Sequence, residues 1–82
     1  MATETTDATV LHHIERLVDE EHALLDRKEK QRADHERLEQ IRVALDQYWD
    51  LLQQRRAKRD AGQDPDQAEV RPPEVVESYQ RR

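Results

Sequence analysis

The chain has 82 residues, enough for one small domain, and 40% of them are charged against 34% hydrophobic. This composition borders on that of disordered chains, but the apolar residues recur periodically and so indicate packed helices. A net charge of −5 argues against general nucleic-acid binding, and the absence of cysteine excludes disulfides and thiolate sites. With no apolar run of membrane-spanning length and no secretory signal at residues 1–9, we expect a soluble cytoplasmic protein.

The first predicted helix follows a flexible polar tail at residues 1–6 and runs from Asp7 to about Lys28 or Lys30. Thr6 or Asp7 is expected to cap this helix, because a short side-chain oxygen accepts a hydrogen bond from a free N–H group of the first turn. The apolar residues recur at spacings of three and four, which places them on one helix face. They are Val10, Leu11, Ile14, Leu17, Val18, Leu24 and Leu25.

The second predicted helix begins near Asp34 and ends before Gly62. Gly62 is expected to adopt the left-handed conformation that commonly follows a helix C-terminus. Four bases suit the negative end of the helix dipole there: Arg55, Arg56, Lys58 and Arg59. The apolar residues of this helix are Leu38, Ile41, Ala44, Leu45, Tyr48, Trp49, Leu51 and Leu52.

The join between the two helices contains no glycine or proline, so one continuous helix, paired antiparallel in a swapped dimer, is an alternative. Two features favour a turn near residues 29–34. The apolar stripe lapses after Leu25, and the two stripes are mirror images about a point between Gln31 and Arg32. We therefore predict an antiparallel hairpin over residues 7–61. Its predicted opposed pairs are Leu11 with Leu52, Ile14 with Trp49, Val18 with Leu45, and Leu25 with Leu38.

Residues 62–82 form a predicted C-terminal arm. Asp64 and Pro65 have the pattern of a cap followed by a first-turn proline, which predicts a single helical turn. The Pro72-Pro73 pair ends that turn, and a last short helix is expected to open there.

The apolar faces are wider than a two-stranded seam requires, so the hairpin is expected to need a further cover. The predicted fold is therefore all-α: a coiled-coil-like two-helix antiparallel hairpin with a short proline-containing arm, completed by dimerisation into a four-helix bundle. Two alternatives remain open, in which the arm folds back on the open face or another protein supplies the cover.

Candidate chemistry is sparse. Asp19 and His22 have the three-residue spacing used in di-iron bundles, and His22 is expected to point toward the seam opposite Ile41. The second helix offers no clearly inward carboxylate, so a metal-binding bundle is the weakest alternative and no cofactor is predicted. His12 and His13 diverge by about 100° on a helix and are expected at the surface. Without a nucleophile set, a phosphate loop or an enclosed site, we predict that the protein is not an enzyme.

Trp49, the single tryptophan, is expected to be a core anchor against Ile14, with an interface hot spot as the alternative. We predict a small interaction protein that contacts a partner, or a second copy of itself, through the helical surface and the arm. A second hypothesis is an accessory factor that binds the ribosome or RNA polymerase through the basic end of the second helix. The predicted contact residues are Tyr48, Trp49, Arg55, Arg56, Val75, Val76 and Tyr79.

Several stretches together are similar to one family. They are the segments at residues 17–22, 45–52, 54–57, 62–66, 70–72 and 74–79, of which the tryptophan-centred block and the arm are the most specific. In order and spacing they resemble the small actinobacterial proteins grouped as DUF2630, over roughly residues 10–80. The resemblance implies a bacterial, cytoplasmic protein. The family has no assigned activity, cofactor or catalytic residue, so the resemblance implies none here.

Overall fold

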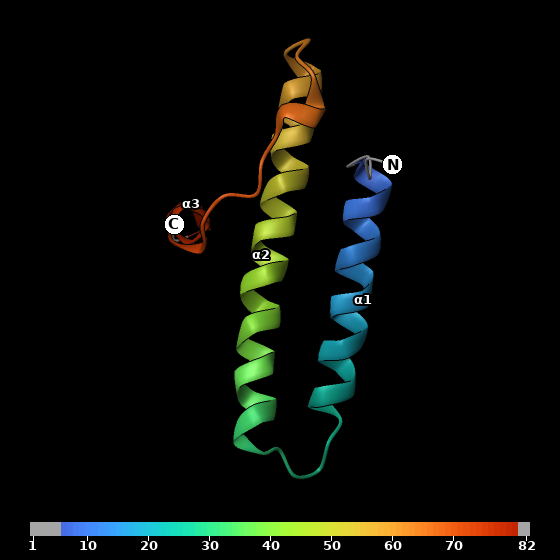
Figure 1. The fold of residues 1–82 in the computed structure, drawn as a ribbon, viewed down its shortest axis with the longest axis vertical. Coiled ribbons are helices and arrows are strands. Elements are labelled where there is room, and N and C mark those ends of the chain that lie inside the picture. Colours follow the sequence, from blue (N-terminus) through green and yellow to red (C-terminus); the bar gives the residue numbers. More distant parts are fainter. Residues whose placement is uncertain (1–5, 81–82) are drawn as a thin grey trace.

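The protein is a helical hairpin followed by a short arm, as described by a computed structural model that covers residues 6–80, with side chains to residue 78. Its elements are α1 (Asp7–Leu25), α2 (Arg32–Asp60), the 3-10 turn η1 (Pro65–Gln67) and α3 (Pro73–Gln80). Helices α1 and α2 run antiparallel side by side (Figure 1). The predicted all-α hairpin is confirmed, and the predicted tail at residues 1–6 lies, apart from Thr6, outside the described residues.

The start of each long helix has a local cause. Helix α1 is capped as predicted by Thr6, whose hydroxyl accepts a hydrogen bond from the Thr9 amide at 3.1 Å. Helix α2 begins at Arg32, two residues before the predicted Asp34, and Asp34 acts within the first turn. Its carboxylate accepts from the Gln31 amide at 3.0 Å and pairs with Arg27 at 2.8 Å. The connection therefore lies at residues 26–31, a few residues earlier than predicted.

The seam of the hairpin is built around Val10 and Ile14 from α1 and Leu51 from α2. The predicted register is close to the one observed, because Asp7 pairs with Arg55 and His13 stacks on Tyr48, one and two residues from the predicted partners. The prediction of which α2 residues face the seam was wrong at one position. Trp49 is 47% exposed and is not a core anchor.

The C-terminus of α2 is a Schellman motif, in which two backbone bonds satisfy the last carbonyls. The Gln63 amide donates to the Lys58 carbonyl at 2.7 Å, and the Gly62 amide donates to the Arg59 carbonyl at 3.0 Å. This geometry requires a left-handed residue, and Gly62 has a φ of 74°. The predicted role of Gly62 is confirmed, and η1 follows with Asp64 accepting from the Asp66 amide as its cap.

Helix α3 packs on the side of α2 that faces away from α1, so α2 lies between α1 and α3 (Figure 1). Val76 is 1% exposed and anchors α3. Polar contacts add to this anchor: Arg71 makes a two-point ion pair with the buried Asp50 carboxylate, and the amides of Gln47 and Gln54 donate to arm carbonyls. Helix α3 therefore covers the outer side of α2, whereas the start of the arm packs back on the hairpin, where Ala68 lies against the cluster of Val10, Ile14 and Leu51.

We predict that Gly62→Ala lowers the free energy of unfolding by about 1 kcal/mol, because a Cβ disfavours the left-handed conformation. No atom lies within 4 Å of the position that this Cβ would occupy, so the cost is one of backbone conformation alone. Thermal denaturation at fixed protein concentration measures it. Gly62→Asn is the matched variant and is expected to lose less, because asparagine tolerates this conformation. Equal losses for the two variants would contradict this account.

Candidate functional site

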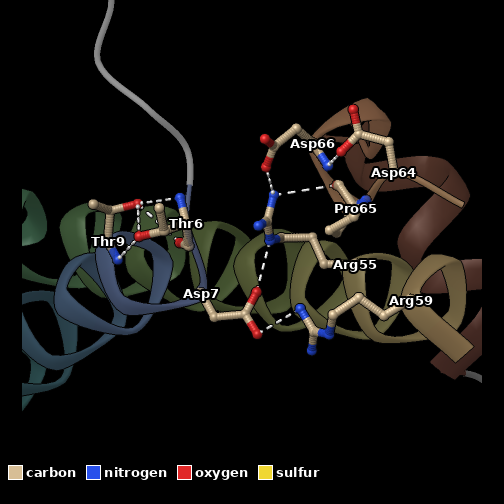
Figure 2. A network of polar contacts seen from close by, with 8 residues as sticks. All are labelled: Thr6, Asp7, Thr9, Arg55, Arg59, Asp64, Pro65 and Asp66. Atoms are coloured by element: carbon tan, nitrogen blue, oxygen red, sulfur yellow. Dashed lines mark hydrogen bonds and ion pairs between the residues drawn. The ribbon is translucent and has the colours of Figure 1, made fainter.

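Arg55 was expected to contact a partner, but its guanidinium is buried within the fold (Figure 2). Nε donates to the Asp7 carboxylate at 2.7 Å, and Nη1 donates to Asp66 at 2.9 Å and to the Pro65 carbonyl at 3.2 Å. The side chain thus joins the start of α1, the end of α2 and η1. Because these bonds occupy the guanidinium, Arg55 is not available to a partner.

The basic end of α2 is partly neutralised by the same network. Arg59 binds the second oxygen of Asp7 at 2.8 Å (Figure 2), and the hydrogen bond from Arg55 holds the pKa of Asp7 below its ordinary range. Within residues 6–78, Arg56 and Lys58 are the bases of this end that make no ion pair. A surface with two available cations is a weak phosphate-binding site, because affinity grows with the number of phosphates neutralised.

One face of the hairpin carries an open groove of about 440 Å³. Along it, the rings of His13 and Tyr48 stack at 5.5 Å with an interplanar angle of 9°. Arg37 binds the Glu20 carboxylate at 2.5 and 2.8 Å, and this bond lowers the pKa of Glu20. The remaining lining residues are Arg16, Leu17 and Ala44. Its acid is already ion-paired, and the groove holds no serine, threonine or cysteine nucleophile.

The candidate metal residues do not converge. Asp19 and His22 are both exposed, so the expectation that His22 points into the seam was wrong, and Leu24 is the residue of that turn that is buried. Over residues 6–80, no three side chains of the metal-binding types are close enough together to hold an ion.

The other face of the hairpin, here named the apolar flank, presents large apolar side chains that are not buried. Leu11, Leu25 and Trp49 are 40%, 52% and 47% exposed. The remaining members are half-buried where they border the seam. The apolar flank consists of Leu11, Val18 and Leu25 from α1 and of Leu38, Leu45, Trp49 and Leu52 from α2.

Helix geometry places these residues on the face opposite the groove. On α1, Ile14 points into the seam. A residue three positions before it and one three positions after it are rotated by about 60° in opposite senses. Leu17 lines the groove, so Leu11 projects to the other face. Val18 and Leu25 follow Leu11 at seven-residue intervals and continue the same stripe.

The same reasoning holds for α2, where Ile41 is fully buried in the seam. Ala44 lines the groove, so Leu38 projects to the apolar flank. Leu45 and Leu52 follow at seven-residue intervals, and Trp49 lies one turn from each. The two stripes therefore form one continuous apolar surface across both helices.

The other predicted contact residues are distributed unevenly. Arg56 is exposed beside the apolar flank, and Val75 is exposed on α3, whereas Val76 is buried against α2 and is not available. Tyr79 belongs to α3, and its side chain lies outside the described part of the chain. The exposed Leu11 and Leu25 were not among the predicted contact residues, although their seven-residue spacing with Val18 was a signal for a second stripe.

A family model described as a protein of unknown function, DUF2630, matches residues 6–81. The chain belongs to the DUF2630 family. Uncharacterized proteins of Mycobacterium tuberculosis and Mycobacterium bovis are each 45% identical to it over 78 residues, which cover 90% of either chain. No solved structure matches it. Between residues 6 and 80, no helix is long and apolar enough to cross a membrane.

We predict that Arg55→Met lowers the free energy of unfolding of this DUF2630 protein by about 2 kcal/mol, because charge-assisted bonds that join three segments are lost. A loss of this size corresponds to roughly 10 °C in melting temperature for so small a domain. Circular dichroism melts at fixed concentration provide the measurement. Arg56→Met is the matched control, since that side chain is exposed, and it is expected to melt like the unaltered protein. A control that melts as low as Arg55→Met would contradict the assignment.

The Asp50–Arg71 pair gives a pH dependence of known sign. The hydrogen bonds from Arg71 hold the pKa of Asp50 below its ordinary value of 3.8. A carboxylate whose pKa is lowered on folding stabilises the fold above its unfolded pKa, and this contribution is lost as the pH falls through the folded pKa. The midpoint of unfolding in urea is therefore expected to be lower at pH 3 than at pH 7.

Arg71→Met is expected to reduce this fall. Without the guanidinium, burial raises the pKa of Asp50, so protonation at low pH relieves a charge that Arg71 no longer neutralises. An unchanged difference between the two midpoints would show that Asp50 does not depend on Arg71.

Proposed function

We propose that this DUF2630 protein is a small, non-catalytic helical interaction module that binds a protein partner through the apolar flank. The observation that carries the proposal is the apolar flank itself. Seven apolar side chains, none of them buried, align on one face of a chain in which 40% of residues are charged. Contiguous apolar surface of this kind is characteristic of binding sites, because exposing it to water is unfavourable.

The distribution of exposure supports this site over others. Among the side chains of residues 6–78, the large hydrophobic ones with high exposure are Leu11, Leu25, Trp49, Val70 and Val75. Three of the five belong to the apolar flank, including the single tryptophan. Tryptophan is enriched among residues that dominate binding energy, because its ring buries a large area at a low cost in conformational entropy.

The electrostatics of the described residues support a non-catalytic role. The carboxylates with shifted pKa values are all lowered by ion pairs or backbone hydrogen bonds, as for Asp34 and Asp50. A general acid at neutral pH requires the opposite, a carboxyl whose pKa is raised by burial or by a like charge. The groove is open to water and so gives its groups little desolvation.

The alternative of a nucleoprotein accessory is not carried forward. It depended on four clustered bases at the end of α2. Arg55 is buried, and both Arg55 and Arg59 bind Asp7, which leaves too few free cations for a phosphate-binding surface.

Site-specific photo-cross-linking in a mycobacterial host tests the proposal. A photoreactive phenylalanine analogue placed at Trp49 is expected to give discrete protein adducts on irradiation, because that side chain would lie within the interface. The same analogue at Arg16, on the groove face, is the matched control and is expected to give none. Equal adducts at both positions, or none at Trp49, would contradict a role for the apolar flank.

A further inference from the structure

We infer that the occupant of the apolar flank is a second copy of this chain, packed flank to flank to form a four-helix bundle. The inference rests on the proposed function, because it names the partner of the same surface.

The spacing on each helix is that of a bundle seam. Leu11, Val18 and Leu25 are seven residues apart on α1, and Leu38, Leu45 and Leu52 are seven residues apart on α2. A seven-residue repeat keeps one stripe facing a partner helix along a left-handed supercoil. The inner seam of the hairpin is centred on Ile14, Ile41 and Leu51. Val18, Leu45 and Leu52 pack against the seam from one side and remain partly exposed on the other. Each helix therefore carries a second stripe suited to a helix outside the hairpin.

The two stripes are complementary to each other. A two-fold axis parallel to the helices would place α1 of one copy over α2 of its partner, so the stripes of α1 and α2 must lie at matching heights. They do so closely, since Asp7 lies opposite Arg55 and His13 opposite Tyr48. The α1 stripe then faces a stripe of the same chemistry and spacing on the partner's α2, and the same pairing recurs on the other side of the axis.

The area is sufficient for a stable dimer. The 19 residues of α1 extend for about 28 Å at about 1.5 Å per residue. Two packed helices are about 20 Å wide, so the face covers about 560 Å² on each copy and about 1,100 Å² in total. Specific interfaces bury roughly 1,000 Å² or more in total, and this face reaches that size.

The opposite face explains why association would stop at two copies. The groove side is polar, with Arg16 exposed and the Glu20–Arg37 ion pair along it. A molecule with one apolar face and one polar face forms a closed dimer when the apolar faces meet. No second apolar face is then left to bind further copies and extend a filament. The arm leaves the face accessible, since Leu11, Leu25 and Trp49 stay 40%, 52% and 47% exposed in its presence.

Sedimentation equilibrium from about 1 to 500 μM, with the full chain, tests the inference. The expected mass is twice the chain mass of 9.8 kDa at the upper concentrations. Leu25→Lys is expected to weaken dimerisation by about 100-fold or more, because it places two charges in the interface. Val70→Lys is the matched control, since Val70 is 53% exposed but lies on the arm, and it is expected to dimerise normally.

The emission of the single tryptophan gives a readout that needs no variant. Trp49 is expected to emit at longer wavelength in dilute protein and to shift to shorter wavelength as the dimer forms and excludes water. A monomeric mass over the whole range with no shift overturns the inference, as does a dimer that Leu25→Lys and Val70→Lys leave equally intact. A monomer whose Trp49 cross-linker captures a different protein overturns this inference alone, whereas a monomer without any adduct also removes the proposed function.

Discussion

The arrangement of the chain depends on Arg55, which holds three segments with one side chain. Its guanidinium reaches Asp7 at the first turn of α1 and Asp66 and the Pro65 carbonyl in η1 (Figure 2). Asp7 and Arg55 are 48 positions apart in the sequence, so the bond forms only when the hairpin has closed in one register. The Arg55 side chain is buried, so removing its carboxylate partners leaves an uncompensated buried charge, and this cost favours the arrangement that pairs it.

Helix α2 is the central element because its sides differ in chemistry. The side toward α1 is apolar, with Ile41 and Leu51 buried. The outer side is polar and binds the arm through Asp50, Gln47 and Gln54. Hydrophobic contact is non-directional and hydrogen bonds are directional, so these polar contacts hold the arm in a defined position while Val76 and Ala68 add apolar contact. A chain with so few hydrophobic residues thus docks three segments onto one helix.

Local sequence signals predicted where helices and turns begin and end. The roles of individual polar side chains depended on contacts between segments far apart in the sequence. Caps and turn residues act within a few positions, so Thr6, Gly62 and Pro65 behave as the sequence indicates. The roles of Arg55 and Asp50 had no such signal. A base near a helix C-terminus is explained by the dipole alone, and an acid in mid-helix resembles a solvated surface residue. Their partners, Asp7 and Arg71, become visible only once distant segments meet.

The position of Trp49 shows that the burial of an apolar residue likewise cannot be predicted from the local sequence alone. Height along a hairpin follows from counting residues, because the rise per residue is constant, and the predicted register was nearly correct. Rotation about the axis depends on which apolar residues the partner helix can accommodate, and α2 carries more of them than one seam holds. Ile41, Leu51 and the polar Arg55 occupy the inner positions, so Trp49 is turned outward with the stripe of Leu38, Leu45 and Leu52.

This outward rotation connects the fold to the proposed interaction. The molecule measures 49 × 35 × 19 Å, and its long helices lie in one layer (Figure 1). Stable domains normally bury apolar surface between two layers. The arm does not provide a second layer over the apolar flank, because α3 lies on the side of α2 away from α1 and the start of the arm packs at the Asp7 end of the seam. The polar character that fixes the arm there is therefore what leaves the apolar flank open, and a second hairpin is the smallest addition that turns one layer into two.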